Sequence, residues 1–154
     1  MPDVPAEVVE AVLVASRALL GVMAVSLMPV LEHVTLMQFR ALTLLADLGP
    51  TRIGALAHRL GVHQSTFTRT TDRMVEAGLV HRLENPGNRR EVLVQATEVG
   101  LAHVREVTRR RRHEIEGIVR RLDGPDRNAV RLALETFARA AGEPPLETLV
   151  VLGA

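Results

Sequence analysis

The 154-residue chain contains no cysteine, no tryptophan, no tyrosine and only three phenylalanines. Without cysteine it has no disulfide framework, no thiolate redox switch and no Cys-based zinc site. With so few rings it offers no stacking platform for the bases of single-stranded nucleic acid. It also lacks a Gly-rich phosphate loop, a GxSxG motif and a Cys nucleophile, and its carboxylates are spread along predicted helices. An enzyme is therefore not expected.

Lysine is absent too, and all nineteen basic residues are arginine. The net charge is only +1, but residues 35–95 hold eight Arg against five acids, whereas residues 1–34 hold one Arg against four. A hydrophobic content of 47% excludes disorder. The basic middle segment favours double-stranded DNA as a partner. No basic stretch precedes a short apolar segment with a cleavage site, so a cytoplasmic protein without a signal peptide is expected.

The stretch Val62 to Val80, VHQSTFTRTTDRMVEAGLV, has two different sides at helical spacing. The apolar side holds Phe67, Thr71, Met74 and Val75, and the polar side holds Gln64, Ser65, Thr68, Arg69, Asp72 and Arg73. A helix that enters a DNA major groove needs short polar side chains near its start to reach base edges, and arginines further along to reach bases or phosphates. We therefore predict a recognition helix at about residues 64–77.

The residues before this helix complete a helix-turn-helix. Thr35 and Gln38 have the spacing of a capping box. The helix that follows is predicted to turn Leu36, Phe39, Leu42 and Leu45 inward and to end at Gly49-Pro50. A short helix with Ile53, Leu56, Ala57 and Leu60 then closes at Gly61. A short helix, a tight turn containing Gly and a second helix are typical of this motif.

A β-hairpin is predicted directly after the recognition helix, which ends at Gly78. Residues 80–84 and 91–95 alternate as strands around the turn 85–90. This hairpin, at about residues 80–95, is a wing. Its turn carries the adjacent Arg89 and Arg90, and an arginine at a wing tip can enter the narrow minor groove.

Apolar helices are predicted on both sides of this domain. The first, from Ala6 to Met28 with a stop at Pro29, is apolar nearly all round, so it is buried on most sides or spans a membrane. Only fourteen residues separate Arg17 from Glu32, fewer than the ~20 that a bilayer needs. We therefore expect no membrane contact and a helix buried against a second copy of the chain. An intramolecular core helix is the alternative.

The C-terminal part is predicted to be helical as well. Thr97 caps a helix over about 98–122, whose apolar side holds Leu101, Val104, Val107, Ile115, Ile118 and Leu122. A last helix carries Val130, Leu134, Phe137 and Ala141, and the apolar tail 146–152 is expected to pack on the partner subunit. The predicted fold is mostly α with a small β-hairpin. Residues 1–34 and 98–154 form a helical dimerisation domain, and residues 35–97 form the winged helix-turn-helix.

The long helix carries two further patterns. The run 109–112 is four arginines, which could hold phosphates or an anionic ligand. The more common arrangement is a solvated face with salt bridges, here to Glu106, Glu114 and Glu116. His103, Glu106, His113 and Glu116 share one broad stripe. Neither HExxH nor a His pair at i, i+4 occurs, so no metal site is predicted.

Taken together, these motifs resemble a bacterial MarR-family transcriptional regulator over roughly residues 6–142. The resemblance rests on the runs 38–42, 56–62, 64–66, 72–74, 76–80 and 88–90. It implies a dimeric winged helix-turn-helix, no cofactor, and in many members release of DNA when a small phenolic or other anionic ligand binds between the domains. For such a pocket the resemblance points to Arg17, His33 and Phe39. The chain departs from the family pattern at Asn88, where the wing usually has Asp, and at the weaker cap His63.

The expected function is that of a sequence-specific regulator of transcription, namely a repressor released by a small-molecule effector. A two-fold dimer would bind a pseudo-palindromic operator with half-sites ~34 Å apart. Base edges are assigned to Gln64, Ser65, Thr68 and Arg69, phosphates to Thr66, Arg73 and Arg89, and the minor groove to Arg90. The alternatives are that Thr66 packs under the turn, that Arg73 pairs with Asp72 or Glu76, and that Arg89 is a solvated charge. A ligand-independent architectural DNA binder and a winged-helix module for protein contacts are the alternative functions.

The wing assignment yields a prediction. Replacing Arg90 by alanine removes the side chain assigned to the minor groove, so operator binding should weaken by about 1–3 kcal/mol. A gel-shift titration measures the change, and unchanged binding would remove the wing from the mechanism.

Overall fold

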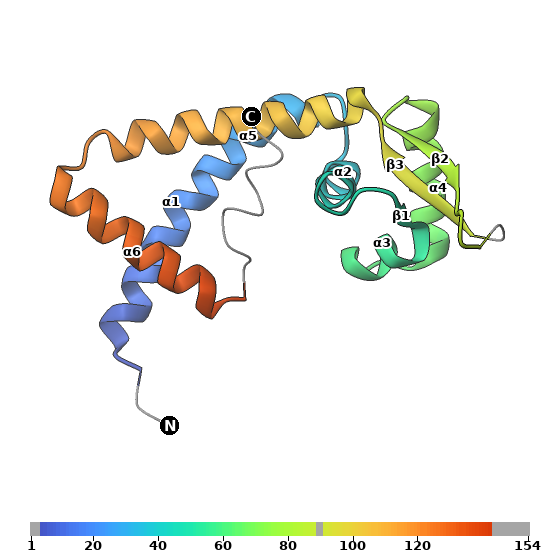
Figure 1. Cartoon of the computed structure of the whole chain (residues 1–154). Helices are drawn as coiled ribbons and strands as arrows, with labels where there is room; N and C mark the ends of the chain where they lie inside the picture. The colour runs from blue at the N-terminus through green and yellow to red at the C-terminus, as the bar shows by residue number, and fades with distance from the viewer. Residues whose placement is uncertain (1–3, 89–90, 143–154) are drawn as a thin grey trace.

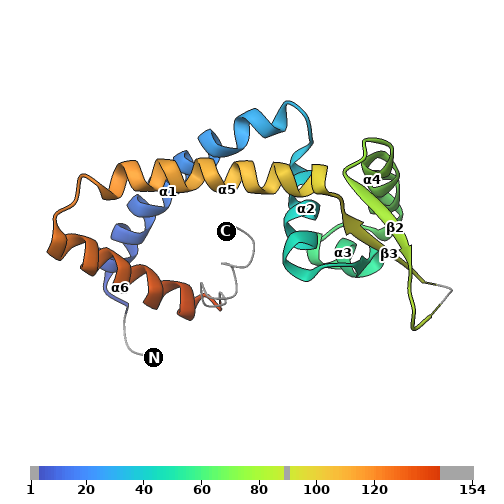
Figure 2. The same ribbon diagram turned by 45° about the horizontal axis from the view of Figure 1, so that its top comes forward.

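The computed structural model describes residues 4–88 and 91–142. Its helices are α1 (Ala6–Leu31), α2 (Leu36–Leu48), α3 (Ile53–Leu60), α4 (Gln64–Glu76), α5 (Glu98–Val119) and α6 (Gly124–Ala140). Its strands are β1 (Thr51–Arg52), β2 (Val80–Glu84) and β3 (Val92–Ala96). Figures 1 and 2 show a winged-helix lobe of α2, α3, α4 and the strands, and a helical lobe of α1, α6 and the far half of α5. The predicted mostly helical winged-helix fold is confirmed.

The three strands form one antiparallel sheet in the order β1-β3-β2. In the hairpin, Val80 lies opposite Ala96 and Glu84 opposite Val92. The predicted β2 is confirmed, and β3 begins one residue later than expected. The edge strand β1, in which Thr51 pairs with Val94, was not predicted. Two residues are too few to show the alternation by which a strand is recognised.

Capping residues mark where several of the helices begin and end. The predicted capping box of α2 is present, since Gln38 N–H donates to Thr35 Oγ1 at 3.2 Å and Thr35 N–H donates to Gln38 Oε1 at 2.8 Å. Gly61 closes α3 and Gly78 follows α4, both with φ of 69°, a conformation that glycine adopts without steric cost. His63 makes no side-chain capping bond to α4, as its weak capping tendency predicts.

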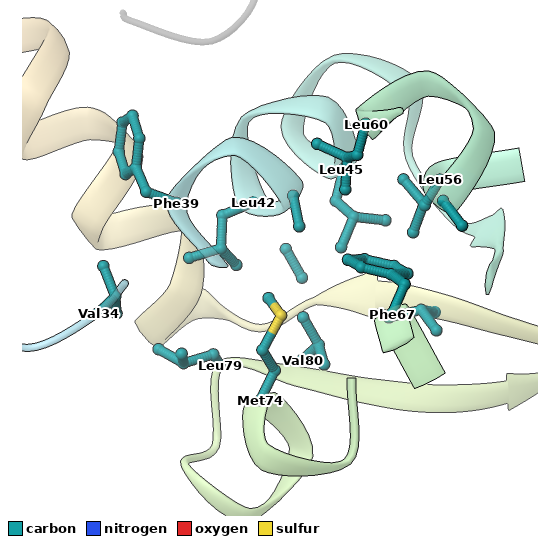
Figure 3. Close-up of a cluster of buried hydrophobic side chains, with 14 of the residues drawn as sticks. Val34, Phe39, Leu42, Leu45, Leu56, Leu60, Phe67, Met74, Leu79 and Val80 are labelled. Carbon is teal, nitrogen blue, oxygen red and sulfur yellow. The ribbon is translucent and has the colours of Figure 1, made fainter. Parts of the chain in front are cut away.

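The winged-helix core is packed from α2, α3, α4 and the sheet (Figure 3). Phe67 and Met74 on the inner side of α4 are each 1% exposed, and Leu42 of α2 is fully buried. One expected core residue is wrong: Leu36 is 53% exposed. The buried side of α2 begins one turn later, at Phe39.

The helix α1 continues through Pro29 to Leu31, so the predicted end at Met28 is wrong. A proline removes one backbone N–H and crowds the preceding turn, but only two residues follow it here. With Arg17 included, the 26-residue helix is long and apolar enough to cross a membrane, and an 18-residue stretch of it has a mean hydropathy of 2.0. The length of α1 therefore does not exclude a membrane span. Near its end, Val30 is buried in the winged-helix core.

Most of the apolar surface of α1 is uncovered in the single chain. Only Val22, Ser26 and Val30 are buried. The exposed large apolar residues of α1 are Val8, Val9, Leu13, Val14, Leu19, Leu20, Met23, Val25, Met28 and Leu31. Coverage of α1 by its own chain, the alternative considered from the sequence, is therefore not observed among the described residues.

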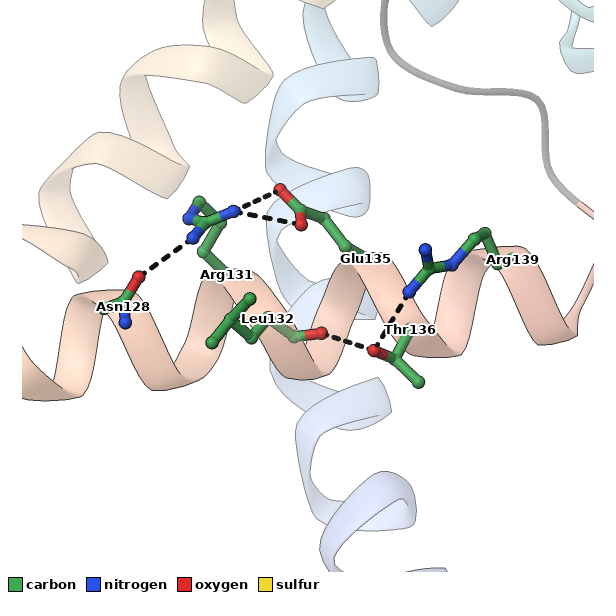
Figure 4. Close-up of polar contacts among 6 residues, drawn as sticks. All are labelled: Asn128, Arg131, Leu132, Glu135, Thr136 and Arg139. Carbon is green, nitrogen blue, oxygen red and sulfur yellow. Dashed lines mark hydrogen bonds and ion pairs between the residues drawn. The ribbon is translucent and has the colours of Figure 1, made fainter.

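The helix α6 also has uncovered apolar side chains, because none of its residues is buried. Val130, Leu132, Leu134 and Phe137 are 38% to 53% exposed. Side-chain pairs along its own surface stabilise it instead (Figure 4). Arg131 Nη1 donates to both carboxylate oxygens of Glu135 at 3.0 Å, and its Nη2 donates to Asn128 at 2.9 Å. Such pairs support a helix whose side chains are not buried by other described residues.

The junction between α5 and α6 is capped from both sides. The helix α5 ends at Val119, three residues before the predicted end. Arg127 Nε donates to the carbonyl of Val119 at 3.2 Å, and the Asp123 side chain accepts from the N–H of Asp126 at 2.8 Å. The apolar tail 146–152 lies outside the described residues.

The packing of α4 can be tested by replacing Phe67 with alanine. The side chain is 1% exposed, so the loss of its buried area and the cavity left behind should lower the free energy of unfolding by about 3–5 kcal/mol. Urea denaturation followed by circular dichroism measures the change. The surface substitution Glu76→Ala is the control and should change stability by less than about 0.5 kcal/mol.

Candidate DNA-binding interface

The side of α4 that faces away from the core carries the polar residues expected to meet DNA. Gln64, Ser65, Thr66, Arg69 and Arg73 are exposed, and Thr68 is half-buried. The opposite side is held by Phe67, Thr71 and Met74, each at most 1% exposed. Because these three side chains fix the rotation of α4 about its axis, its polar side is presented to solvent, as the sequence predicted.

The two arginines of this surface are not neutralised by other described residues. Arg69 and Arg73 form no ion pair within residues 4–88 and 91–142, so the expected alternative of an Arg73 pair with Asp72 or Glu76 is not observed. Asp72 is instead paired with Arg82 of the wing strand β2. Among the described residues, Arg69 and Arg73 therefore keep their charges without an ion pair, and the carboxylate of Asp72 is compensated from outside the helix. A second carboxylate, Glu76, is exposed at the end of α4.

The threonines of α4 bond to the backbone of their own helix. Thr68 Oγ1 donates to the carbonyl of Gln64 at 2.8 Å, and Thr70 Oγ1 donates to that of Thr66 at 3.3 Å. A hydroxyl that donates in this way keeps its acceptor lone pairs. Thr68 can therefore accept from the N6 amino group of adenine or the N4 amino group of cytosine, or pack its methyl against thymine.

The side chain of Gln64 lies over the first turn of α3. A Cβ added to Gly54 would stand 3.2 Å from Gln64 Oε1, closer than an ordinary contact. An open concavity of about 490 Å³ adjoins this contact, lined by Arg52, Ile53, Gly54, Ala55, Gln64, Glu91 and Val92. The absence of a side chain at Gly54 thus leaves room for the first residue of the recognition helix.

The base of the wing is tied to the start of α3 through Glu91. One of its carboxylate oxygens accepts from Arg52 Nη1 at 3.1 Å and the other from Asn85 Nδ2 at 2.9 Å. Asn85 Oδ1 in turn accepts the N–H of Gly87 at 3.0 Å within the wing turn. The pairing of Glu91 with Arg52 could not be predicted from the sequence, because 39 residues separate the two and no local pattern relates them. Arg89 and Arg90 lie outside the described residues.

Comparison with known proteins agrees with this geometry. The family model described as "MarR family" matches residues 34–92. The chain is 32% identical over 112 residues to the HTH-type transcriptional regulator Mb0904 of Mycobacterium bovis, covering 73% of this chain and 78% of the relative. The chain belongs to the MarR family. It is accordingly a transcriptional regulator with a DNA-binding domain, and not an enzyme.

Solved structures share the MarR-family fold along most of the chain. The crystal structure of RV1404 from Mycobacterium tuberculosis is 40% identical, with a TM-score of 0.78, and the match covers 93% of this chain and 98% of that one. The transcriptional regulator Tm0710 from Thermotoga maritima is 25% identical with a TM-score of 0.74, over 87% and 94% of the two chains. A shorter match, 36% identical over 46% of this chain and 44% of the relative, is to the HTH-type transcriptional repressor NicR of Pseudomonas putida.

The three residues that the MarR resemblance suggested for an effector pocket are not brought together in one subunit. His33 stacks on His103 of α5 with ring centroids 6.2 Å apart, and Phe39 is buried in the core at 8% exposure. Arg17 is exposed on α1, about 21 Å along the helix from Leu31 at 1.5 Å per residue. The sequence pattern relates His103 only to the His/Glu stripe of the long helix and does not predict its contact with His33.

In the arginine run 109–112 of α5, Arg109 and Arg110 form salt bridges with described residues. Glu106 accepts hydrogen bonds from Arg109 and Arg110, and these bonds lower the pKa of its carboxyl to about 2. The expected bridge to Glu106 is thus confirmed, whereas Glu116 pairs with Arg120 and not with the run. Arg111 Nε is buried and makes no hydrogen bond. No three His, Asp or Glu side chains converge as a metal site within the part of the chain that the structure describes.

The link between the wing and α3 through Glu91 predicts the direction in which operator affinity changes when Glu91 is removed. Removing a carboxylate near DNA should by itself raise affinity, because the carboxylate repels phosphates. If Glu91 positions the wing, Glu91→Ala should instead lower operator affinity, by about three- to tenfold. Fluorescence anisotropy with a labelled operator measures both effects. Glu84→Ala, which removes an exposed carboxylate of β2, is the control and should not lower affinity; a gain in affinity for Glu91→Ala contradicts the positioning role.

Proposed function

We propose that this MarR-family protein is a cytoplasmic repressor that binds a pseudo-palindromic operator as a homodimer and is released by a small aromatic or anionic effector. One observation carries the DNA-binding half of the proposal. Arg69 and Arg73 stand exposed and unpaired among described residues on the polar side of α4, while Asp72 on the same helix is compensated by Arg82. Exposed arginines that no described carboxylate neutralises attract the DNA backbone.

Each polar residue of the surface has a role in this proposal. Base edges are read by Gln64, Ser65, Thr68 and Arg69. Phosphates are held by Thr66, Arg73 and Arg89, and the minor groove takes Arg90. The exposure of Thr66 supports its role, because a residue packed under the turn would be buried. Gln64 and Ser65 stand in the first turn of α4, where a recognition helix meets base edges.

A homodimer accounts for the uncovered apolar surface of the helical lobe. The exposed side chains of α1 and α6 include Leu20 at 67% and Phe137 at 53%. Contiguous apolar surface of this kind marks a protein–protein interface. A two-fold pairing through residues 1–34 and 98–154 would carry the two α4 helices to half-sites about 34 Å apart on one face of the DNA.

The effector part of the proposal rests on cationic groups in the helical lobe. Arg17 can approach His33 only across the dimer interface, since α1 separates them within one chain. An arginine and an imidazole suit a carboxylate or phenolate ligand. The relative NicR is described as a repressor, which supports repression as the mode of regulation.

The DNA-binding proposal is tested by selecting bound fragments from sheared host DNA and titrating the best fragment at two salt concentrations. A two-fold symmetric site and a steep negative salt slope are expected. Arg73→Ala should weaken binding to all sequences and reduce the salt slope by about 1, whereas Arg69→Ala should also relax base preference. Arg121→Ala, in the turn between α5 and α6, removes an exposed charge of the same sign outside the winged helix and is the matched control. Enrichment of no sequence would assign the winged helix to protein contacts.

The dimer is tested by placing a charge on α1. Leu20→Glu puts a carboxylate into the proposed interface, so it should convert the dimer to monomer in sedimentation and reduce operator affinity at least tenfold, because a single half-site remains. Leu36→Glu makes the same change at a similarly exposed leucine of α2 in the winged-helix lobe and should remain dimeric. A monomeric wild-type protein would contradict the proposal.

A further inference from the structure

The helix α5 begins directly against the turn that follows α4. Gly100, in the first turn of α5, is buried. A Cβ at this position would lie 2.3 Å from the carbonyl oxygen of Leu79 and 2.7 Å from Leu42 Cδ2. Both distances are far shorter than any real contact, and the first is to backbone. The start of α5 therefore packs too closely against Leu79 for any side chain at position 100.

Hydrogen bonds from Thr97 tie the same two segments together. Thr97 Oγ1 donates to the carbonyl of Gly78 at 2.6 Å and accepts the N–H of Gly100 at 3.2 Å. The backbone N–H of Thr97 donates to the carbonyl of Leu79 at 3.0 Å. One side chain thus caps α5 and at the same time binds the turn that ends α4.

The turn itself is bonded back to the recognition helix. Leu79 N–H donates to the carbonyl of Met74 at 2.9 Å, and Gly78 N–H donates to that of Val75, also at 2.9 Å. Leu79 is buried. A continuous chain of backbone hydrogen bonds therefore runs from α4 through residues 78–79 to Thr97 and α5.

Because α5 is long, a small change in its angle relative to α4 displaces its far end by several ångströms. The helix has 22 residues, or about 33 Å at 1.5 Å per residue. A 10° change at its start would move its far end, relative to α4, by about 6 Å, more than the ~3.4 Å between successive bases of a strand. The far end of α5 lies in the helical lobe, where α6 follows it and α1 packs against α5 (Figure 2).

We infer that Thr97 and Gly100 are positioning residues that set the half-site spacing of the operator, by fixing the direction of α4 relative to α5. The inference rests on the proposed dimeric DNA binding. Thr97 and Gly100 need not touch DNA, and their effect is on which spacing of two half-sites is accepted. Each half-site is still read by α4 alone.

The experiment measures the affinity of the wild-type dimer for operators whose half-site spacing is changed by −1, 0 and +1 base pair. The wild-type protein should discriminate against the altered spacings by at least about tenfold, since one base pair rotates the second half-site by about a tenth of a turn. Thr97→Val removes both side-chain hydrogen bonds and keeps the shape of the side chain. It should reduce this discrimination to about threefold or less, while affinity for an isolated half-site stays within about twofold of wild type.

The controls separate positioning from simple destabilisation. Thr97→Ser keeps the hydroxyl and should restore the spacing preference, and Thr108→Val removes an exposed threonine bond within α5 alone and should leave it unchanged. Gly100→Ala should shift the preferred spacing or prevent folding, whereas Gly117→Ala meets nothing within 4 Å and should do neither. Equal loss of affinity at every spacing in Thr97→Val would overturn the inference, as would a wild-type protein that tolerates all three spacings. A wild-type protein that binds no two-site operator would instead refute the proposed function.

Discussion

The burial of one side of α4 is the constraint on which the rest of the structure depends. Phe67 and Met74 are almost completely buried, and they hold the helix against α2, α3 and the sheet. This packing fixes the rotation of α4 about its axis and therefore which of its residues face solvent. The polar side is available for DNA because the apolar side is occupied. The short helix α3, the edge strand β1 and the wing are arranged around the same core.

In the helical lobe, by contrast, the apolar side chains of α1 and α6 are mostly exposed. The helix α1 is apolar nearly all round, yet only Val22, Ser26 and Val30 are buried by the rest of the chain. The helix α6 buries none of its own residues. The core of the winged-helix lobe is thus covered by described residues of one chain, including Val30 of α1 and Val107 of α5. The helical lobe has apolar surface that no described residue covers. This difference between the two lobes is what links the proposed DNA binding to a pairing of two subunits.

Much of the winged-helix lobe could be predicted from the sequence, because its signals are local. The capping box at Thr35, the glycine after α4 and the alternation of β2 each involve residues within one element. Features that join distant parts of the chain could not be found in this way. The pair of Arg52 with Glu91, the stack of His33 on His103 and the contact of Gly100 with Leu79 depend on the fold itself. The continuation of α1 past Pro29 was missed because a proline in the last turn disturbs little of a helix that is already formed.

The pair between Asp72 and Arg82 joins the electrostatics of the two DNA-facing elements. Asp72 brings a negative charge to the recognition helix, and its compensating cation belongs to the hairpin and not to the helix. If the hairpin were displaced, the carboxylate of Asp72 would lose its partner, and it would partly offset the attraction of Arg69 and Arg73 for phosphates. The position of the wing therefore sets part of the charge on the polar side of α4, in addition to whatever the wing itself touches.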